Sequence, residues 1–228
     1  MATKYSPKIV NDGLVLSLDA ANNKSYSGSG TTWNDLSGNG NNGTLTNGPT
    51  FSTANMGSIV FDGTNDYISI PHAFNISSGG VTFNIWFKLT STGWSPLICD
   101  WTGPAYSFNI QVYTGALNIS IRNSAQSELI ALANASINTN VIYNLQFTYD
   151  KTTKIGSSYI NGILNDTKTS GQTDAAIVNS SNAWSIGLKQ DTGNVISGNV
   201  YLCNIYNKSL SATEVLQNYN VAKNRFGY

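Results

Sequence analysis

The feature that most constrains this chain is a strict alternation of apolar and polar positions. It is clearest from Val81 to Leu89, where every second residue is apolar, and residues 108–113, 117–122 and 142–149 repeat the pattern. A period of two matches the side chains on one face of a β-strand, and a polar second face indicates burial on one side only. The alternation therefore predicts an all-β protein.

Turn signals separate the apolar runs. Asp62-Gly63-Thr64-Asn65 joins apolar runs at residues 58–61 and 67–70. We interpret this segment as a β-hairpin, because Asp-Gly favours tight turns. Asn161-Gly162 predicts a second hairpin with a type I′ turn, and Thr114-Gly115 predicts a reversal between two more strands.

The end of the chain has a different pattern. Ser211 and Glu214 have the spacing of a capping box, which predicts a helix over residues 212–223 that covers an edge or end of the fold. About ten short strands and one helix predict two antiparallel sheets packed face to face. We expect residues 1–12 to form an N-terminal arm and residues 13–228 to form one domain.

The charge content restricts the partners. Only 11% of the residues are charged and the formal net charge is zero, which argues against nucleic-acid binding. No apolar run approaches the roughly 20 residues of a membrane helix. The first residues lack the apolar core of a signal peptide, so we expect synthesis and folding in a cytosol. Cys99 and Cys203 lie in apolar runs and are expected to be buried, with a disulfide left open.

Several motifs together resemble a known family. They lie at residues 13–20, 33–43, 61–68, 158–162 and 198–214, and thus cover nearly the whole chain. In these stretches the chain resembles a laminin-G-like domain of the concanavalin A-like lectin/glucanase superfamily. The resemblance implies a jelly-roll sandwich of two curved sheets.

The resemblance also carries a functional expectation. The chain is similar to virion proteins of tailed bacteriophages, which occur as capsid fibres, decorations or tail-fibre modules. This implies a virion structural protein made in the host cytoplasm, with other virion proteins and host-surface glycans as partners, and assembled as a homo-oligomer. A freestanding carbohydrate-binding lectin, a purely structural assembly module and a degenerate glucanase are the alternatives, because fold does not fix function.

The acidic residues argue against catalysis. Glycoside hydrolysis generally needs two carboxyl groups at a set separation. The chain has only two glutamates, Glu128 and Glu214, and the second belongs to the predicted helix cap. The single histidine, His72, follows a proline at the end of a predicted strand. We therefore expect a protein that is not an enzyme.

Carbohydrate binding is the more plausible chemistry. Aromatic faces pack on sugar C–H groups, and amides and hydroxyls match the ring hydroxyls. We expect one polar sheet face to carry the glycan site, with an ordinary solvated face or a subunit contact as the alternative. Two loop tryptophans are candidates for glycan contact or for burial against a partner. The candidate residues are Trp86, Asn109, Gln111, Asn118 and Arg122 on the face, and Trp94 and Trp101 in the loop.

Calcium is the one candidate cofactor. It prefers about six to eight oxygen ligands. Asp62 and Asp66 with nearby carbonyls could supply some of them, and relatives in the superfamily often carry calcium at a loop rim. Asp62-Gly63 is also explained as turn chemistry, so both interpretations stay open.

Overall fold

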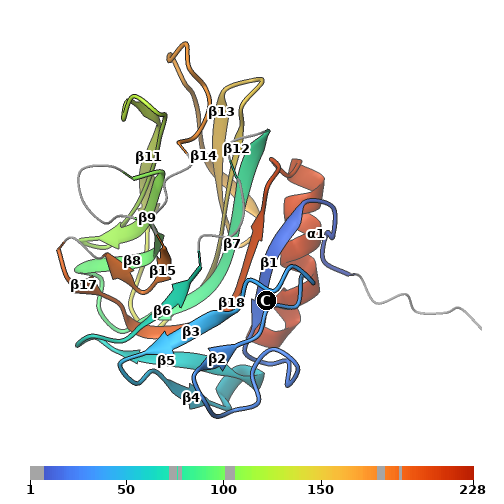
Figure 1. Ribbon diagram of the computed structural model, residues 1–228, viewed down its shortest axis with the longest axis vertical. Coiled ribbons are helices and arrows are strands. Elements are labelled where there is room, and N and C mark those ends of the chain that lie inside the picture. The colour runs from blue at the N-terminus through green and yellow to red at the C-terminus, as the bar shows by residue number, and fades with distance from the viewer. Residues whose placement is uncertain (1–7, 72–75, 77–78, 101–105, 179–182, 190–191) are drawn as a thin grey trace, which may run out of the picture.

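Two antiparallel sheets pack face to face, and one helix lies against the outer side of one of them (Figure 1). The computed structural model describes residues 8–71, 76, 79–100, 106–178, 183–189 and 192–228. The predicted all-β jelly-roll sandwich with one C-terminal helix is confirmed.

Sheet 1 lies on the helix side of the sandwich. Its strand order is β14 (Ile163–Thr169), β13 (Ile155–Ile160), β12 (Ile142–Asp150), β7 (Gly80–Leu89), β18 (Ser197–Tyr206), β5 (Ser58–Asp62) and β4 (Thr50–Ser52). The first half of β18 pairs with β5. Its second half pairs with β1 (Leu14–Asp19), so the long strand β18 connects both ends of the chain.

Sheet 2 forms the opposite layer. Its strand order is β11 (Glu128–Ser136), β10 (Ala116–Arg122), β9 (Phe108–Tyr113), β8 (Trp94–Cys99), β15 (Trp184–Ile186), β6 (Tyr67–Ile70), β3 (Gly43–Thr46) and β2 (Thr32–Trp33). A short ribbon of β16 (Leu188–Lys189) and β17 (Asn194–Val195) lies beside β8. Two 3₁₀ turns, η1 (Ala54–Met56) and η2 (Lys223–Phe226), complete the fold.

The core lies between the two sheets and is rich in aromatic rings. Phe83 from sheet 1 lies 4.7 Å, between ring centroids, from Phe108 of sheet 2. Phe108 in turn makes an edge contact with Trp184 at 4.4 Å. Each of these side chains is almost fully buried. Burial of a large apolar side chain contributes about 1.5–3 kcal/mol, so the alternating strands hold the layers together.

The predicted hairpin at residues 58–70 is wrong. β5 belongs to sheet 1 and β6 to sheet 2, so the turn between them crosses from one layer to the other. The turn itself forms as expected, because the Asp62 Oδ1 accepts the Thr64 N–H at 2.7 Å. Both strands still direct their apolar faces into the same core, with Phe61 on one and Ile68 on the other.

The other predicted turns are confirmed. Ile160 pairs with Ile163 across Asn161-Gly162, and both turn residues have positive φ, at 52° and 76°. Thr114 and Gly115 likewise reverse the chain between β9 and β10.

The C-terminal helix α1 spans Ala212–Ala222, close to the predicted range. The Glu214 carboxylate accepts the Ser211 N–H at 2.8 Å, and the Ser211 hydroxyl accepts the Glu214 N–H at 3.3 Å. Partial burial opposes ionisation, but the Ser211 hydrogen bonds and the Lys208 ammonium hold the Glu214 pKa below its usual value. Within the described part of the chain, no helix has the length and apolarity to span a membrane.

The helix packs on the outer face of sheet 1 rather than on an edge or end. The Gln146 side chain of β12 donates to the Val215 carbonyl at 2.9 Å. The Asn218 amide donates to the Tyr206 hydroxyl of β18 at 3.1 Å. These contacts come from strands on both sides of β7, so α1 covers the middle of the sheet.

Candidate functional site

Trp86 does not belong to an open polar face. It lies on the outer face of β7, beneath α1, and is 0% exposed. Its ring stacks on Tyr219 with centroids 5.6 Å apart and on Phe226 at 4.3 Å. The other four candidates of the polar face lie on sheet 2. The predicted grouping of Trp86 with them is therefore wrong, because the helix returns to cover this sheet.

The four polar candidates do come together on the outer face of sheet 2. Asn109 and Gln111 lie on β9, and Asn118 and Arg122 lie on β10. Gln111 is paired directly with Asn118. Their apolar neighbours along each strand point into the core. The alternation thus placed these four side chains on one face, as predicted.

This face is not an ordinary solvated surface. Asn109 is only 2% exposed and Gln111 6%. The Asn109 Oδ1, the Gln111 Oε1 and the Arg122 Nε are buried and have no hydrogen-bond partner in the described structure. Buried polar atoms are usually paired, so three unpaired atoms on one face need an explanation.

Tyr106 closes one side of the face. The Arg122 guanidinium carbon lies 4.3 Å from the centroid of its ring, and its hydroxyl is 3.2 Å from the Ser120 Oγ. The Tyr106 N–H also donates to the Gln126 side chain at 3.1 Å. These contacts fix an aromatic ring over β10 next to the polar row.

An exposed aromatic pair forms the other side. The rings of Trp94 on β8 and Tyr113 on β9 have centroids 3.9 Å apart and are 44% and 41% exposed. Strand pairing places the two residues opposite each other. The Lys189 ammonium lies 5.8 Å from the Trp94 ring centroid. Trp94 is thus on a strand and open to solvent, whereas Trp101 lies outside the described residues.

Two members of this surface were not among the predicted site residues. Tyr113 lies in the same alternation as Gln111, so its position on the face was visible in the sequence. Lys189 arrives from the β16–β17 ribbon, and no local pattern indicates its proximity to Trp94.

The carboxylates of the crossing turn are engaged by backbone groups. The Asp66 Oδ2 accepts the Asp62 N–H at 3.1 Å. Burial raises the pKa of Asp66, the Asp62 N–H lowers it, and the nearby Asp62 charge raises it again. Among the described residues, no group of three or more His, Cys, Asp or Glu side chains could hold a metal. Turn chemistry accounts for these two aspartates, and calcium at this turn stays a prediction.

The cysteines are separate and buried. Cys99 lies on sheet 2 and Cys203 on sheet 1, and neither forms a disulfide. Burial raises the pKa of the Cys203 thiol to about 12. The open question of a disulfide is answered, since the two residues are not paired.

A family comparison agrees with this architecture. Residues 62–216 of the 228 match the family model described as the concanavalin A-like lectin/glucanases superfamily, laminin G type. The chain belongs to this family. No curated protein matches the sequence.

Solved structures show the same fold within the superfamily. The binding domain of Paraclostridial Mosquitocidal Protein 1 superposes with a TM-score of 0.75 at 18% identity, over 92% of this chain and 52% of that one. The botulinum neurotoxin serotype D ligand binding domain, in complex with N-acetylneuraminic acid, gives 0.72 at 16%, over 92% and 51%. The botulinum neurotoxin type G receptor binding domain gives 0.69 at 18%, over 92% and 51%.

These likenesses concern the fold alone, because the identities are low. The chain spans about half the length of each of these structures. The superfamily sandwich therefore corresponds to one part of each toxin binding domain.

Proposed function

We propose that this protein is a non-enzymatic, glycan-binding sandwich displayed on the surface of a tailed-phage particle. Its glycan contact is the outer face of sheet 2, centred on Trp94 and Tyr113. The observation that carries the proposal is this exposed aromatic pair beside a row of side-chain amides.

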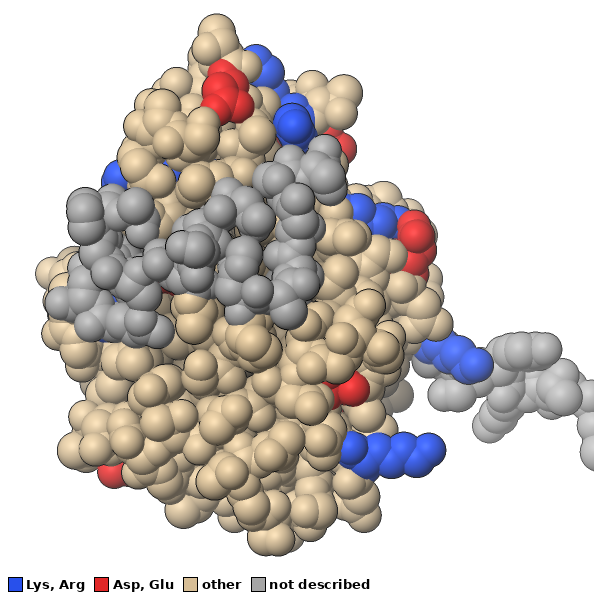
Figure 2. All heavy atoms as spheres, viewed as in Figure 1, with Lys and Arg blue, Asp and Glu red and all other residues tan. Residues whose placement is uncertain are grey.

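The chemistry of the face suits a carbohydrate. Exposed aromatic rings offer an apolar surface for sugar C–H groups. Tryptophan and tyrosine also carry a polar N–H or O–H group, so they suit a ligand with both apolar and polar parts. The half-buried Asn118 supplies an amide on the same face, opposite the largely buried Gln111. On the side of the molecule seen in Figure 2, the charged side chains of the described residues are scattered and form no large patch of one sign. Such a surface suits a neutral or weakly charged polymer better than a phosphate backbone.

The toxin binding domains support the choice of ligand class. One of them was solved in complex with N-acetylneuraminic acid, an acidic sugar. One cation, the largely buried Lys189 ammonium, lies 5.8 Å from the Trp94 ring centroid. Sialylated glycans therefore belong in the first set of probes, together with neutral glycans.

The proposal includes no catalysis. The Glu214 carboxylate holds the start of α1 and pairs with Lys208 at 3.0 Å. Glu128 lies opposite Arg122 at the edge of sheet 2. The two glutamates thus belong to different layers of the sandwich and do not form a pair of carboxyl groups.

A glycan array tests the binding face. We expect the wild-type protein to bind a restricted set of glycans, and Trp94→Ala and Tyr113→Ala each to remove most of the signal. Leu216→Ala is the matched control, because Leu216 is a 46% exposed apolar residue on the helix side. A flat array with the wild type, or equal binding by Trp94→Ala, would contradict the proposal.

The virion role rests on the resemblance of the sequence to phage virion proteins. Particles purified from a host that produces this protein should contain it, at a position that antibody labelling in electron microscopy locates. We also propose that it is a homo-oligomer there, which mass photometry of the pure protein checks. Glycan binding without incorporation into particles would favour a freestanding lectin. Incorporation without glycan binding would favour a structural assembly module.

A further inference from the structure

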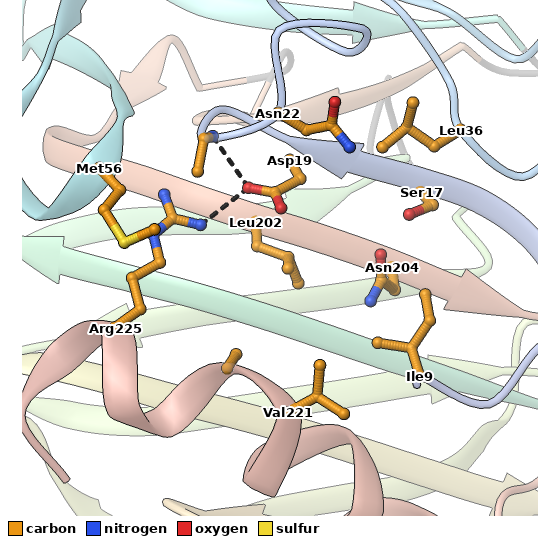
Figure 3. A pocket seen from close by; sticks show the side chains of 12 residues that line it. Ile9, Ser17, Asp19, Asn22, Leu36, Met56, Leu202, Asn204, Val221 and Arg225 are labelled. Carbon is orange, nitrogen blue, oxygen red and sulfur yellow. Dashed lines mark hydrogen bonds and ion pairs between the residues drawn. The ribbon is translucent and has the colours of Figure 1, made fainter. Parts of the chain in front are cut away.

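A cavity on the opposite side of the molecule is independent of the glycan face. It lies between the outer face of sheet 1, helix α1 and the loop after β1, and has a volume of about 340 Å³ (Figure 3). Ligand sites usually have about 300–1,000 Å³, with apolar walls and a few placed polar groups. The cavity is thus of the size of a small ligand.

The floor of the cavity is a polar row on two paired strands. Ser17 of β1 is directly opposite Asn204 of β18, and Asp19 is opposite Leu202. Ser17 and Asn204 are almost fully buried. Figure 3 shows these side chains on the floor, with Asp19 toward the Arg225 end. A hydroxyl, an amide and a carboxylate therefore lie side by side on the cavity floor.

Asn204 is the unexplained member of this row. It is 0% exposed, and neither its Nδ2 nor its Oδ1 has a hydrogen-bond partner in the described structure. Asn84, its register partner on β7, differs, because the Asn84 Oδ1 accepts the Asn144 Nδ2 at 2.7 Å. An unpaired buried amide is destabilising, and a ligand with one donor and one acceptor would satisfy it.

The charge in the cavity is already balanced. The Asp19 Oδ1 lies 2.7 Å from the Arg225 Nη1, and it also accepts the Ala21 N–H at 2.9 Å. Arg225 is held in turn by the carbonyls of Asn55 and Gly57. This fixed ion pair leaves no net charge for a charged ligand to neutralise, so the site favours a neutral one.

Apart from Asn22, the remaining walls are apolar. Ile9, Leu36, Met56 and Val221 lie around the polar row (Figure 3). A ligand that fits must therefore present hydroxyls on one side and C–H groups on the others. We propose that this cavity binds a neutral, polyhydroxylated small molecule of about monosaccharide size, with Asn204 and Ser17 as its hydrogen-bonding partners.

Titration calorimetry and thermal unfolding with defined probes test this site. The probes are D-glucose, D-mannose, N-acetyl-D-glucosamine and myo-inositol, with D-glucuronate as the charged comparison. We expect at least one neutral probe to bind saturably and to raise the Tm, and glucuronate to bind at least about tenfold more weakly. Absence of binding by all four neutral probes, or tighter binding of glucuronate, would overturn the proposal.

Variants separate ligand binding from folding. Asn204→Leu should weaken binding about tenfold or more while leaving the Tm of the free protein equal or higher, because it removes an unpaired amide. Asn144→Leu is the matched control and should lower the Tm, because it breaks a paired amide. Binding by Asn204→Leu equal to wild type would overturn the proposal.

Two further variants test the proposal if Asn204→Leu does not fold. Val221→Phe fills the cavity from α1 without changing the polar row, and should also abolish probe binding. Trp94→Ala, on the other face of the sandwich, should leave probe binding unchanged. Loss of probe binding in Trp94→Ala would assign the signal to the glycan face, and would overturn the separate site.

Discussion

The position of Trp86 gives the sharpest prediction about the architecture. If α1 covers sheet 1, Trp86→Ala should destabilise the fold and should leave glycan binding by the folded protein unchanged. A tryptophan buries about 150–250 Å². At about 25 cal/mol per Å², full burial contributes about 4–6 kcal/mol.

Alanine retains part of this burial, so we expect a loss of about 3–5 kcal/mol in the free energy of unfolding. For a chain of this size each kcal/mol shifts the Tm by about 2–4 °C, which gives a fall of about 6–20 °C. Trp86→Phe should cost less, because it keeps a ring between Tyr219 and Phe226 and removes an indole N–H that has no partner in the described structure.

Differential scanning calorimetry and denaturant unfolding measure the change, and Trp94→Ala is the control. Trp94 is 44% exposed, so its removal should cost less than about 1 kcal/mol. A fall in Tm of under about 3 °C for Trp86→Ala, together with loss of glycan binding, would refute the helix-covered sheet and restore Trp86 as a ligand residue.

The remaining predictions concern a cap, a turn and a cation. The pKa of Glu214 is lowered in the folded state, so the stabilisation by its carboxylate is present above the unfolded pKa and is lost as the pH falls through the folded pKa. Glu214→Gln should therefore flatten the fall of the free energy of unfolding with decreasing pH on the acid side. An unchanged slope would contradict the assignment. Gly162→Ala should destabilise by more than about 1 kcal/mol in urea unfolding, because φ is +76° and a Cβ would lie 2.6 Å from the Tyr219 ring; an unchanged midpoint would argue against this turn and its helix contact. If calcium binds the crossing turn, the wild type should have a higher Tm in about 1 mM calcium, the range of weak extracellular sites, than in EDTA. Asp66→Asn should show no such difference, and equal responses of the two proteins would exclude Asp66 as a ligand.

The local structure was largely predictable from the sequence. The alternation from Val81 to Leu89 predicted β7, and Asn161-Gly162 predicted the turn between β13 and β14. The Ser211 and Glu214 pair predicted the start of α1 to the residue. In each case the signal and the structure lie within a few residues of each other, so propensity and capping decide the result.

The long-range arrangement was not predictable from local patterns. The Asp62-Gly63 turn has the same backbone chemistry whether the next strand returns to its own sheet or crosses to the other layer. Trp86 has the alternation of a solvated face, and only the docking of Tyr219 and Phe226 more than 100 positions later buries it. The ion pair of Arg225 with Asp19 likewise joins opposite ends of the chain.

The candidate site followed the same division. The period of two correctly placed Asn109, Gln111, Asn118 and Arg122 on one face. It carried no information on burial, so the unpaired side-chain oxygens of Asn109 and Gln111 and the proximity of Lys189 to Trp94 emerged only from the fold.

The indole N–H signals of the five tryptophans test the central claim most directly. In a proton–nitrogen correlation spectrum, each resonance is assigned by its Trp→Phe variant, and the strongest glycan from the array is titrated in. The account predicts that the Trp94 signal shifts in a saturable way, while the buried indoles of Trp33, Trp86 and Trp184 keep their positions. A saturable shift of Trp86 with no change at Trp94 would contradict it.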